Sequence, residues 1–323
     1  MQTAISFAPM EGITNFIYRS AHAKYFPGIA RYYSPFICPN SSRKLTTREM
    51  TDVLPENNPG VRLIPQALTH SAEDFLWLAG KLQALGYDEI NLNLGCPSGT
   101  VVTKGKGAGQ LADLTALRSF FDAVFRDCPI AVSAKTRVGI VEPEEFPAIL
   151  DVLRQYPFRE VIVHPRTREM QYKGTPLRES FAQALDGSPF PVTWNGNLFS
   201  LADIRALQEE FPAVHAVMLG RGLIANPGLC CAAQGLPVPE KAVYKAFADE
   251  VFDGYLSLWR DAKAVVCHMK EFWSYMISLF PDNAKYAKAI RKAVTPADLR
   301  DATARLFDER EIVQIEQWEF RRL

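Results

Sequence analysis

The sequence repeats one unit, a short apolar run followed by a stretch whose apolar residues have helical spacing. We identify eight runs, at residues 5–8, 30–35, 62–67, 89–94, 130–135, 160–164, 191–194 and 216–219. Several are continuously apolar, as at 161–163, which is typical of parallel strands buried on both faces. Between the runs, residues 71–74 and 200–203 have the pattern of capping boxes at helix starts.

This repeat predicts an α/β fold. Eight strand–helix units favour a (β/α)8 TIM barrel, and an open doubly wound sheet is the alternative. A glycine- and proline-containing break at 234–239 ends the alternation, and the pattern beyond it is helical only. We therefore predict a barrel domain over residues 1–235 and a small all-helical domain over residues 240–323. The helical domain would hold one helix around 243–258, a second around 265–280 and a third capped by Thr295.

Composition narrows the class of protein. Lys+Arg and Asp+Glu are balanced at 36 each, so binding of nucleic acid would need a local basic face rather than overall charge. The cysteines form neither a C-x-x-C pair nor a zinc-type cluster, so we expect free thiols and no metal. The chain shows no signal-peptide pattern and no apolar run of about 18 residues, so we expect a cytoplasmic protein without a membrane span.

Polar residues follow the ends of the predicted strands, and in a barrel these positions meet at one face. Residues 220–222 (GRG) and 195–197 (NGN) follow the eighth and seventh runs. Glycine allows backbone N–H groups to approach a phosphate, and arginine supplies a fixed positive fork. The pair therefore indicates a phosphate site. Two tight turns with a solvated arginine are the alternative.

Lys135 and Cys96 carry the most reactive chemistry. Lys135 ends a buried strand and needs an anionic partner, which could be a bound flavin or a carboxylate such as Glu89 or Glu160. Cys96 follows a strand end and is a candidate nucleophile or proton donor; a buried structural cysteine is the alternative. The glycine-rich stretch 105–109 suggests a mobile loop able to close over a substrate.

Other polar residues have weaker patterns. The amides of Gln66 and Asn93 could hold a planar heterocycle or cap the barrel mouth. His164 is either a ligand contact or a structural histidine, and we interpret Cys230, Cys231 and His268 as structural.

A basic stretch runs from residue 260 to 292, where seven Lys and Arg residues stand against three acidic ones. Lys285, Lys288 and Lys292 follow i, i+3, i+7 spacing and share one face of a predicted helix. This face either follows the phosphates of RNA or is an ordinary solvated surface.

Together these motifs resemble those of the tRNA-dihydrouridine synthases. They follow the family's order, at 8–14 (APMEGIT), 91–97 (NLNLGCP), 105–111 (GKGAGQL), 135–139 (KTRVG), 164–167 (HPRT), 194–197 (WNGN) and 218–222 (MLGRG). The resemblance covers the whole barrel, and the helical part has the family's size and place. It implies a barrel that binds FMN, takes electrons from NADPH and acts on tRNA, which the helical domain helps to hold. We expect a monomer.

The resemblance also implies roles for single residues. The flavin and its phosphate would contact Pro9, Met10, Gln66, Asn93, Lys135, His164, Asn195, Gly196, Asn197, Gly220 and Arg221. We assign contacts with the RNA to Arg137, Arg166, Lys285, Lys288, Arg291 and Lys292. Reduced flavin would pass a hydride to C6 of uracil, and Cys96, as a thiol, would protonate C5. Stacked bases do not reach a barrel mouth, so the uridine would be flipped out.

Four positions depart from the family's pattern, namely Asn15, Pro165, Trp194 and Asn197. The family usually has Asp, Gly, Ala and an acidic residue there, so an altered target stays open. Two other functions stay open as well. One is an FMN barrel oxidoreductase that acts on a free small molecule such as a dihydropyrimidine. The other is a non-catalytic RNA-binding protein built on a flavin barrel.

Overall fold

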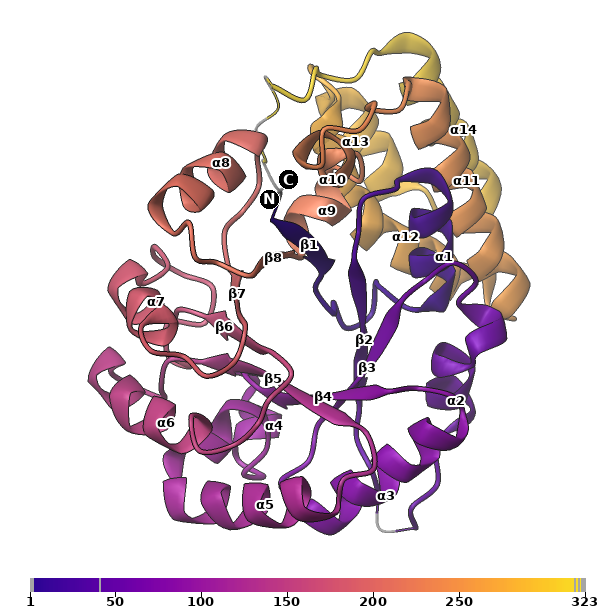
Figure 1. Cartoon of the computed structure of the whole chain (residues 1–323). Coiled ribbons are helices and arrows are strands. Elements are labelled where there is room, and N and C mark those ends of the chain that lie inside the picture. The colour runs from indigo at the N-terminus through magenta and orange to yellow at the C-terminus, as the bar shows by residue number, and fades with distance from the viewer. Residues whose placement is uncertain (1–2, 41, 317, 319, 321–323) are drawn as a thin grey trace.

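The computed structural model describes residues 3–40, 42–316, 318 and 320, and its centre is a closed barrel of parallel strands (Figure 1). The strands are β1 (Ala4–Phe7), β2 (Arg31–Ile37), β3 (Leu63–Ala67), β4 (Glu89–Leu94), β5 (Ala131–Arg137), β6 (Val161–His164), β7 (Val192–Asn195) and β8 (Ala216–Leu219). Each strand pairs with the next along the chain, and β8 pairs with β1. The predicted TIM barrel is confirmed, and ring closure rules out the open sheet.

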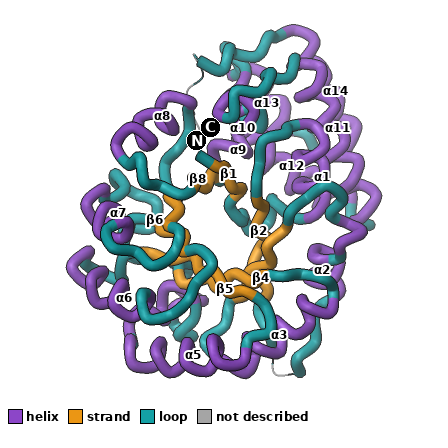
Figure 2. Tube along the Cα trace, in the orientation of Figure 1, coloured by secondary structure: helices purple, strands orange, loops and turns teal. Residues whose placement is uncertain are grey.

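Helices surround the strands as an outer ring (Figure 2). They are α1 (Phe16–Tyr25), α2 (Thr47–Val53), α3 (Ala72–Ala84), α4 (Gly99–Val102), α5 (Leu114–Asp127), α6 (Phe146–Leu153), α7 (Arg178–Leu185), α8 (Leu201–Glu210), α9 (Arg221–Ala225) and α10 (Leu229–Ala233). Short 3-10 turns are η1 (Pro55–Asn57), η2 (Gly107–Ala112) and η3 (Pro143–Glu145). The predicted caps are present, since the Ser71 and Ser200 hydroxyls accept from the backbone of Asp74 and Asp203.

The chain beyond α10 is helical, as predicted. It forms α11 (Lys241–Leu258), α12 (Ala262–Met276), η4 (Ile277–Leu279), α13 (Ala284–Lys292) and α14 (Pro296–Glu309), and Thr295 caps α14. The second helix was expected to reach residue 280. Instead α12 ends at Met276 and tightens into η4, because a residue that precedes a proline, here Phe280, disfavours helical backbone. Within the described ranges, no helix is long and apolar enough to cross a membrane.

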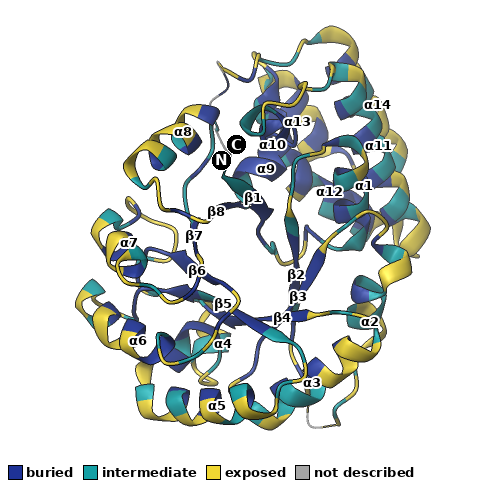
Figure 3. Ribbon diagram, viewed as in Figure 1, coloured by how far each residue is buried: buried dark blue, intermediate teal, exposed yellow. Residues whose placement is uncertain are grey.

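The helical part packs closely on the barrel. Buried residues continue from α1 into α11 and α12 without a break (Figure 3). Phe247 of α11 contacts the rings of Tyr18 and Phe26 edge-on. Gly254 is equally close, since a Cβ there would lie 2.6 Å from Ile17 Cγ2. The two parts therefore share one hydrophobic core, and their division into two domains stays a prediction.

The amino-terminal end of the barrel is closed by buried charges. Arg31 forms ion pairs with both Glu89 and Glu160, and Tyr33 donates to Glu160 at 2.7 Å. Above this cluster the interior is apolar, filled by Ala8, Tyr33, Ile64, Ile162 and Met218. The two carboxylates are thus satisfied at the end of the barrel opposite to the functional loops, and their cation is Arg31.

We expect Arg31→Ala to destabilise the fold by about 3–5 kcal/mol, because it leaves two buried carboxylates without their cation. Urea unfolding followed by circular dichroism measures the loss. The matched control is Arg159→Ala, since Arg159 also lies near Glu89 but is largely exposed, and it should cost about 1 kcal/mol or less. Equal losses in the two variants would contradict this account of the cluster.

A candidate active site at the barrel mouth

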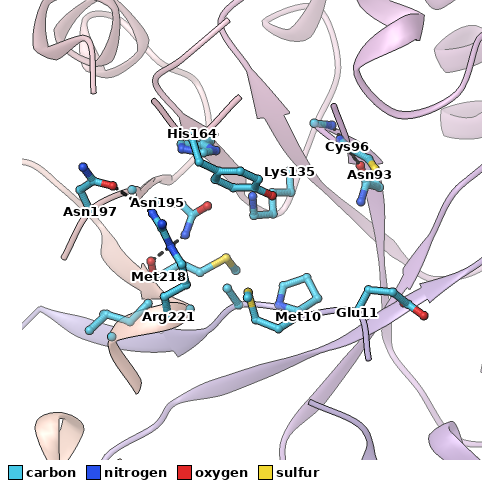
Figure 4. A pocket seen from close by; sticks show the side chains of 18 of the residues that line it. Met10, Glu11, Asn93, Cys96, Lys135, His164, Asn195, Asn197, Met218 and Arg221 are labelled. Carbon is cyan, nitrogen blue, oxygen red and sulfur yellow. Dashed lines mark hydrogen bonds between the residues drawn. The ribbon is translucent and has the colours of Figure 1, made fainter. Parts of the chain in front are cut away.

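The carboxyl ends of the strands surround one cavity of about 440 Å³. Every residue predicted for cofactor binding and catalysis lines it, namely Pro9, Met10, Gln66, Asn93, Cys96, Lys135, His164, Asn195, Gly196, Asn197, Gly220 and Arg221. Figure 4 shows Asn197 and Arg221 at one side, Asn93 and Cys96 at the other, and Lys135 and His164 between them. Barrel closure therefore brings these residues together as expected, while their roles stay predictions.

Asn93 fixes the turn that carries Cys96. Its Oδ1 accepts hydrogen bonds from the backbone N–H groups of Gly95 (3.0 Å) and Cys96 (2.9 Å). Its Nδ2 donates to Gln66 Oε1 at 2.8 Å, and Gln66 Nε2 donates to Asn91 Oδ1 at the same distance. A chain of buried amides thus links β3 to β4 and sets the position of the thiol.

The glycine-rich stretch packs on the same cysteine. Gly107 has φ +58°, and a Cβ there would lie 2.9 Å from Cys96 Cβ, so glycine is needed on both grounds. The Ala108 N–H donates to the Cys96 carbonyl at 3.1 Å. The segment is folded into α4 and η2 against Cys96, and its predicted movement over a substrate stays a prediction.

Lys135 projects into the cavity from β5. Its register partner is Asn93, whereas Glu89 pairs with Ala131 at the other end of the strands, so a salt bridge from Lys135 to Glu89 or Glu160 is wrong. Among the described residues, Lys135 has no hydrogen-bond or ion-pair partner. Burial, and next the charge of Arg137, lower its pKa to about 7. The cavity thus contains an amine that lacks an anion.

His164 is held in one neutral form. Arg166 Nη1 lies 3.0 Å from His164 Nε2, and because a guanidinium only donates, Nε2 must accept. The proton of the neutral imidazole is then on Nδ1. Burial lowers the pKa of His164 well below its usual value, and the charges of Lys135, Arg137, Arg166 and Arg221 add to the effect.

Arg137 and Arg166 hold a loop that carries an exposed aromatic residue. Arg137 donates to the carbonyls of Gly95, Thr167 and Gln171, each at 2.8 Å. Arg166 donates to the carbonyls of residues 173 and 174. Both guanidinium groups thus bind backbone. Arg137 also lines the cavity, whereas Arg166 is fully buried, and a direct contact of either with RNA stays a prediction.

Tyr172 in this loop was not found from the sequence. Its ring lines the cavity and is 58% exposed, and the guanidinium carbons of Arg137 and Arg221 each lie 5.4 Å from its centroid. An aromatic residue in a polar loop after the sixth strand was the one available signal. Only the three-dimensional neighbourhood of two arginines distinguishes it from a solvated tyrosine.

The turns after β7 and β8 form a cradle with little space for side chains. A Cβ on Gly196 would lie 3.3 Å from His164 Cδ2, and one on Gly222 would lie 2.4 Å from the Leu198 carbonyl. Arg221 Nη2 donates to Asn197 Oδ1 at 3.1 Å. Within the described chain, the N–H groups of Gly196 and Asn197 donate no hydrogen bond. Free N–H groups beside an arginine are the donor set that binds phosphate.

The charge of the cavity is strongly positive. Lys135, Arg137 and Arg221 line it, and Glu11 is the one carboxylate among its described lining residues. Glu11 Oε1 is itself 2.8 Å from Arg48. The arrangement therefore favours an anionic ligand.

The four departures from the family's pattern have different surroundings. Asn15 caps α1 and accepts from Tyr255 at 2.8 Å, away from the cavity. Trp194 is buried, and its Nε1 donates to the Gly196 carbonyl at 2.7 Å. The carbonyl of Pro165 accepts from the backbone of residue 177. Asn197 alone faces the cavity, where it gives Arg221 a neutral partner.

The predicted RNA-binding residues of α13 lie outside the cavity on an exposed helix face. Lys285 is paired with Glu309 of α14 at 2.8 Å. Lys288, Arg291 and Lys292 are exposed and have no ion pair with the described residues. Three of the four charges are thus available to a polyanion.

Comparison with known proteins adds three findings. A sequence model of the family described as dihydrouridine synthase (Dus) matches residues 6–318. A tRNA-dihydrouridine(16) synthase of Aquipseudomonas alcaligenes is 28% identical over 302 residues, which is 89% of this chain and 95% of that protein. Its namesake from Pseudomonas putida is 31% identical over 235 residues, 70% of this chain and 71% of that protein. Among solved structures, morphinone reductase in complex with tetrahydroNAD shares the fold, with TM-score 0.52, 13% identity, and 74% of this chain and 89% of that chain covered.

We expect Lys135→Met to stabilise the ligand-free protein near neutral pH. The pKa of Lys135 falls from 10.5 to about 7 on folding, so between these values the unfolded chain holds a proton that the folded chain lacks. Stability should therefore rise with pH across this interval and be lowest below about pH 7. The variant should have a higher melting temperature at about pH 6–7 and a flatter pH profile.

Differential scanning fluorimetry of cofactor-free protein measures this, with Lys81→Met on the exposed face of α3 as the matched control. A Lys135→Met protein that melts below wild type near neutral pH would show that the amine is satisfied in the empty cavity.

Proposed function

Because the chain belongs to the dihydrouridine synthase family, we propose that it reduces a uridine of tRNA to 5,6-dihydrouridine, with FMN in the barrel mouth and NADPH as electron donor. The observation that carries the proposal is the convergence of a thiol, an unpartnered amine and a phosphate cradle on one positively charged cavity. Such a site suits a phosphorylated heterocycle next to a second planar substrate.

The donor set of the cavity fits FMN. Arg221 and the N–H groups of Gly196 and Asn197 would hold the phosphate, where side chains at Gly196 or Gly222 would block its approach. Lys135 would supply the positive charge beside the pyrimidine edge of the flavin. His164 would offer its Nδ1 proton as a hydrogen-bond donor at any pH at which the enzyme works, because its imidazole stays neutral.

We assign the proton transfer to Cys96. Bound FMN, once reduced by NADPH, supplies a hydride to C6 of the uracil. Negative charge then develops on C5 and O4 of the base, and the Cys96 thiol donates its proton to C5. Asn93 holds the backbone of Cys96 in place, and the charges of Lys135 and Arg137 stabilise the developing anion. One hydride and one proton are thus added across the C5–C6 bond.

We infer that Tyr172 contacts the uridine. A stacked base does not reach a barrel mouth, and extruded bases are commonly received on aromatic side chains. The ring of Tyr172 is exposed at the edge of the cavity and flanked by two arginines. It is therefore placed to receive a flipped base above the cofactor.

The target position follows the relatives. Several of them, from Aquipseudomonas, Pseudomonas and Ralstonia, carry position 16 in the name tRNA-dihydrouridine(16) synthase. We therefore propose uridine 16 as the target. The remainder of the tRNA would be held by residues 240–323, where Lys288, Arg291 and Lys292 are exposed on α13.

We expect Cys96→Ala to retain FMN and tRNA but to lose about 10²–10⁴-fold in turnover, because a general acid is removed without a change in the binding groups. The assay supplies purified protein with NADPH and unmodified tRNA transcript, and nucleoside mass spectrometry maps dihydrouridine by position. Wild type should modify position 16. Undiminished product from Cys96→Ala would refute the assigned acid.

The same assay separates the alternatives. Reduction of free uracil or uridine as efficient as that of tRNA would favour a small-molecule oxidoreductase. A flavin-free protein that still binds tRNA would favour a non-catalytic RNA-binding protein.

The double substitution Lys288→Ala/Lys292→Ala should weaken tRNA binding and reduce the slope of log Kd against log salt by about one to two, because two phosphate contacts are lost. Filter binding across a salt series measures the slope. Turnover at saturating tRNA should not change, since neither lysine lies near the cavity. The control is Lys81→Ala on α3, and an equal effect from that variant would contradict a specific RNA-binding face on α13.

A further inference from the structure

The chain does not end its contacts at α14 but returns to the barrel mouth. Lys241 donates to the Arg310 carbonyl at 3.1 Å, and Val313 N–H donates to the Leu279 carbonyl at 2.8 Å. Trp318 is buried, and its Nε1 donates to the Ser278 carbonyl at 3.2 Å. The segment thus follows η4 and crosses from α14 toward α8, as its yellow trace shows in Figure 1. We call these described residues, 310–316, 318 and 320, the C-terminal strap.

Phe320 of the strap joins the barrel to the helical part. Its ring stacks on Phe199 with centroids 4.7 Å apart and planes 10° apart. It also lies nearly parallel to Tyr275, at 6.2 Å and 12°. Phe199 belongs to the turn after β7 and Tyr275 belongs to α12, and both line the cavity. The strap therefore contacts the wall of the cavity from outside.

The ring that Phe320 covers supports the phosphate arginine. The guanidinium carbon of Arg221 lies over Phe199, 5.1 Å from its centroid, and 5.4 Å from that of Tyr172. The turn before Phe199 is immobilised as well, since a Cβ on Gly222 would lie 2.4 Å from the Leu198 carbonyl. Tyr172, Arg221, Phe199 and Phe320 thus form a continuous series of planar groups from the cavity to the strap.

We propose that Phe320 is a positioning residue for cofactor binding, which holds Phe199, and through it Arg221, in the orientation that receives the FMN phosphate. The inference rests on the proposed function. Arginine loses much rotamer freedom when it is fixed, and a site that fixes it before the ligand arrives binds more tightly. Without the ring of Phe320, Phe199 gains mobility and Arg221 loses its support.

The test is the affinity of apoprotein for two flavins that differ only in the phosphate. Flavin fluorescence titration should show that Phe320→Ala binds FMN about tenfold more weakly, because one stacked pair and part of a cation–π contact are lost. Riboflavin, which lacks the phosphate, should bind with nearly unchanged affinity. Phe320→Tyr keeps the ring and should bind FMN as wild type does.

Phe125→Ala is the matched control, because Phe125 is also half-buried and stacked, at 5.3 Å and 19° on Tyr156, but lies on α5 away from the cavity. It should lower the melting temperature without changing the ratio of FMN to riboflavin affinity. The double variant Phe320→Ala/Phe199→Ala should lose little more FMN affinity than Phe199→Ala alone, because the two rings act through one contact.

Two results would overturn the inference alone. They are unchanged FMN affinity in Phe320→Ala, and equal weakening of FMN and riboflavin, which would indicate general loosening of the cavity. A wild-type protein that binds neither flavin would instead contradict the proposed function, and the inference with it.

Discussion

Mutual repulsion among basic side chains at the barrel mouth is the interaction on which the rest of the site depends. Lys135, Arg137, Arg166 and Arg221 all act on His164, and burial lowers the pKa of the lysine to about 7. The other end of the barrel shows the opposite solution, where Arg31 is matched by two carboxylates. One closed sheet thus has a neutralised end, which contributes stability, and a positively charged end, which lacks an anion that a ligand can supply.

The positive end is held in place largely by side chains that bind backbone rather than ligand. Arg137 and Arg166 donate to loop carbonyls, and Asn93 accepts from the turn that carries Cys96. These bonds pre-organise the site before any ligand is present, and such preparation lowers the cost of binding and of charge development. The same reasoning extends outward to Phe199, whose covering ring is supplied by the C-terminal strap.

Local pattern was enough for the architecture and for the membership of the site. The eight strands appeared as apolar runs because parallel strands are buried on both faces, and the caps at Ser71 and Ser200 follow short-range chemistry. Convergence of Cys96 with Lys135 and Arg221 followed from barrel topology alone. What could not be predicted depends on partners distant in sequence, such as Glu309 beside Lys285 and the two arginines beside Tyr172.

The most direct measurement of the central claim is the number of protons taken up when FMN binds, obtained by isothermal titration calorimetry in buffers of different ionisation enthalpy. At about pH 8 the empty cavity holds Lys135 mostly neutral, and an anionic ligand should restore its charge. The account predicts uptake of about one proton per FMN at this pH, which disappears in Lys135→Met. Binding without proton uptake would contradict it, because the amine would then carry its charge, and hence have its anion, before the cofactor arrives.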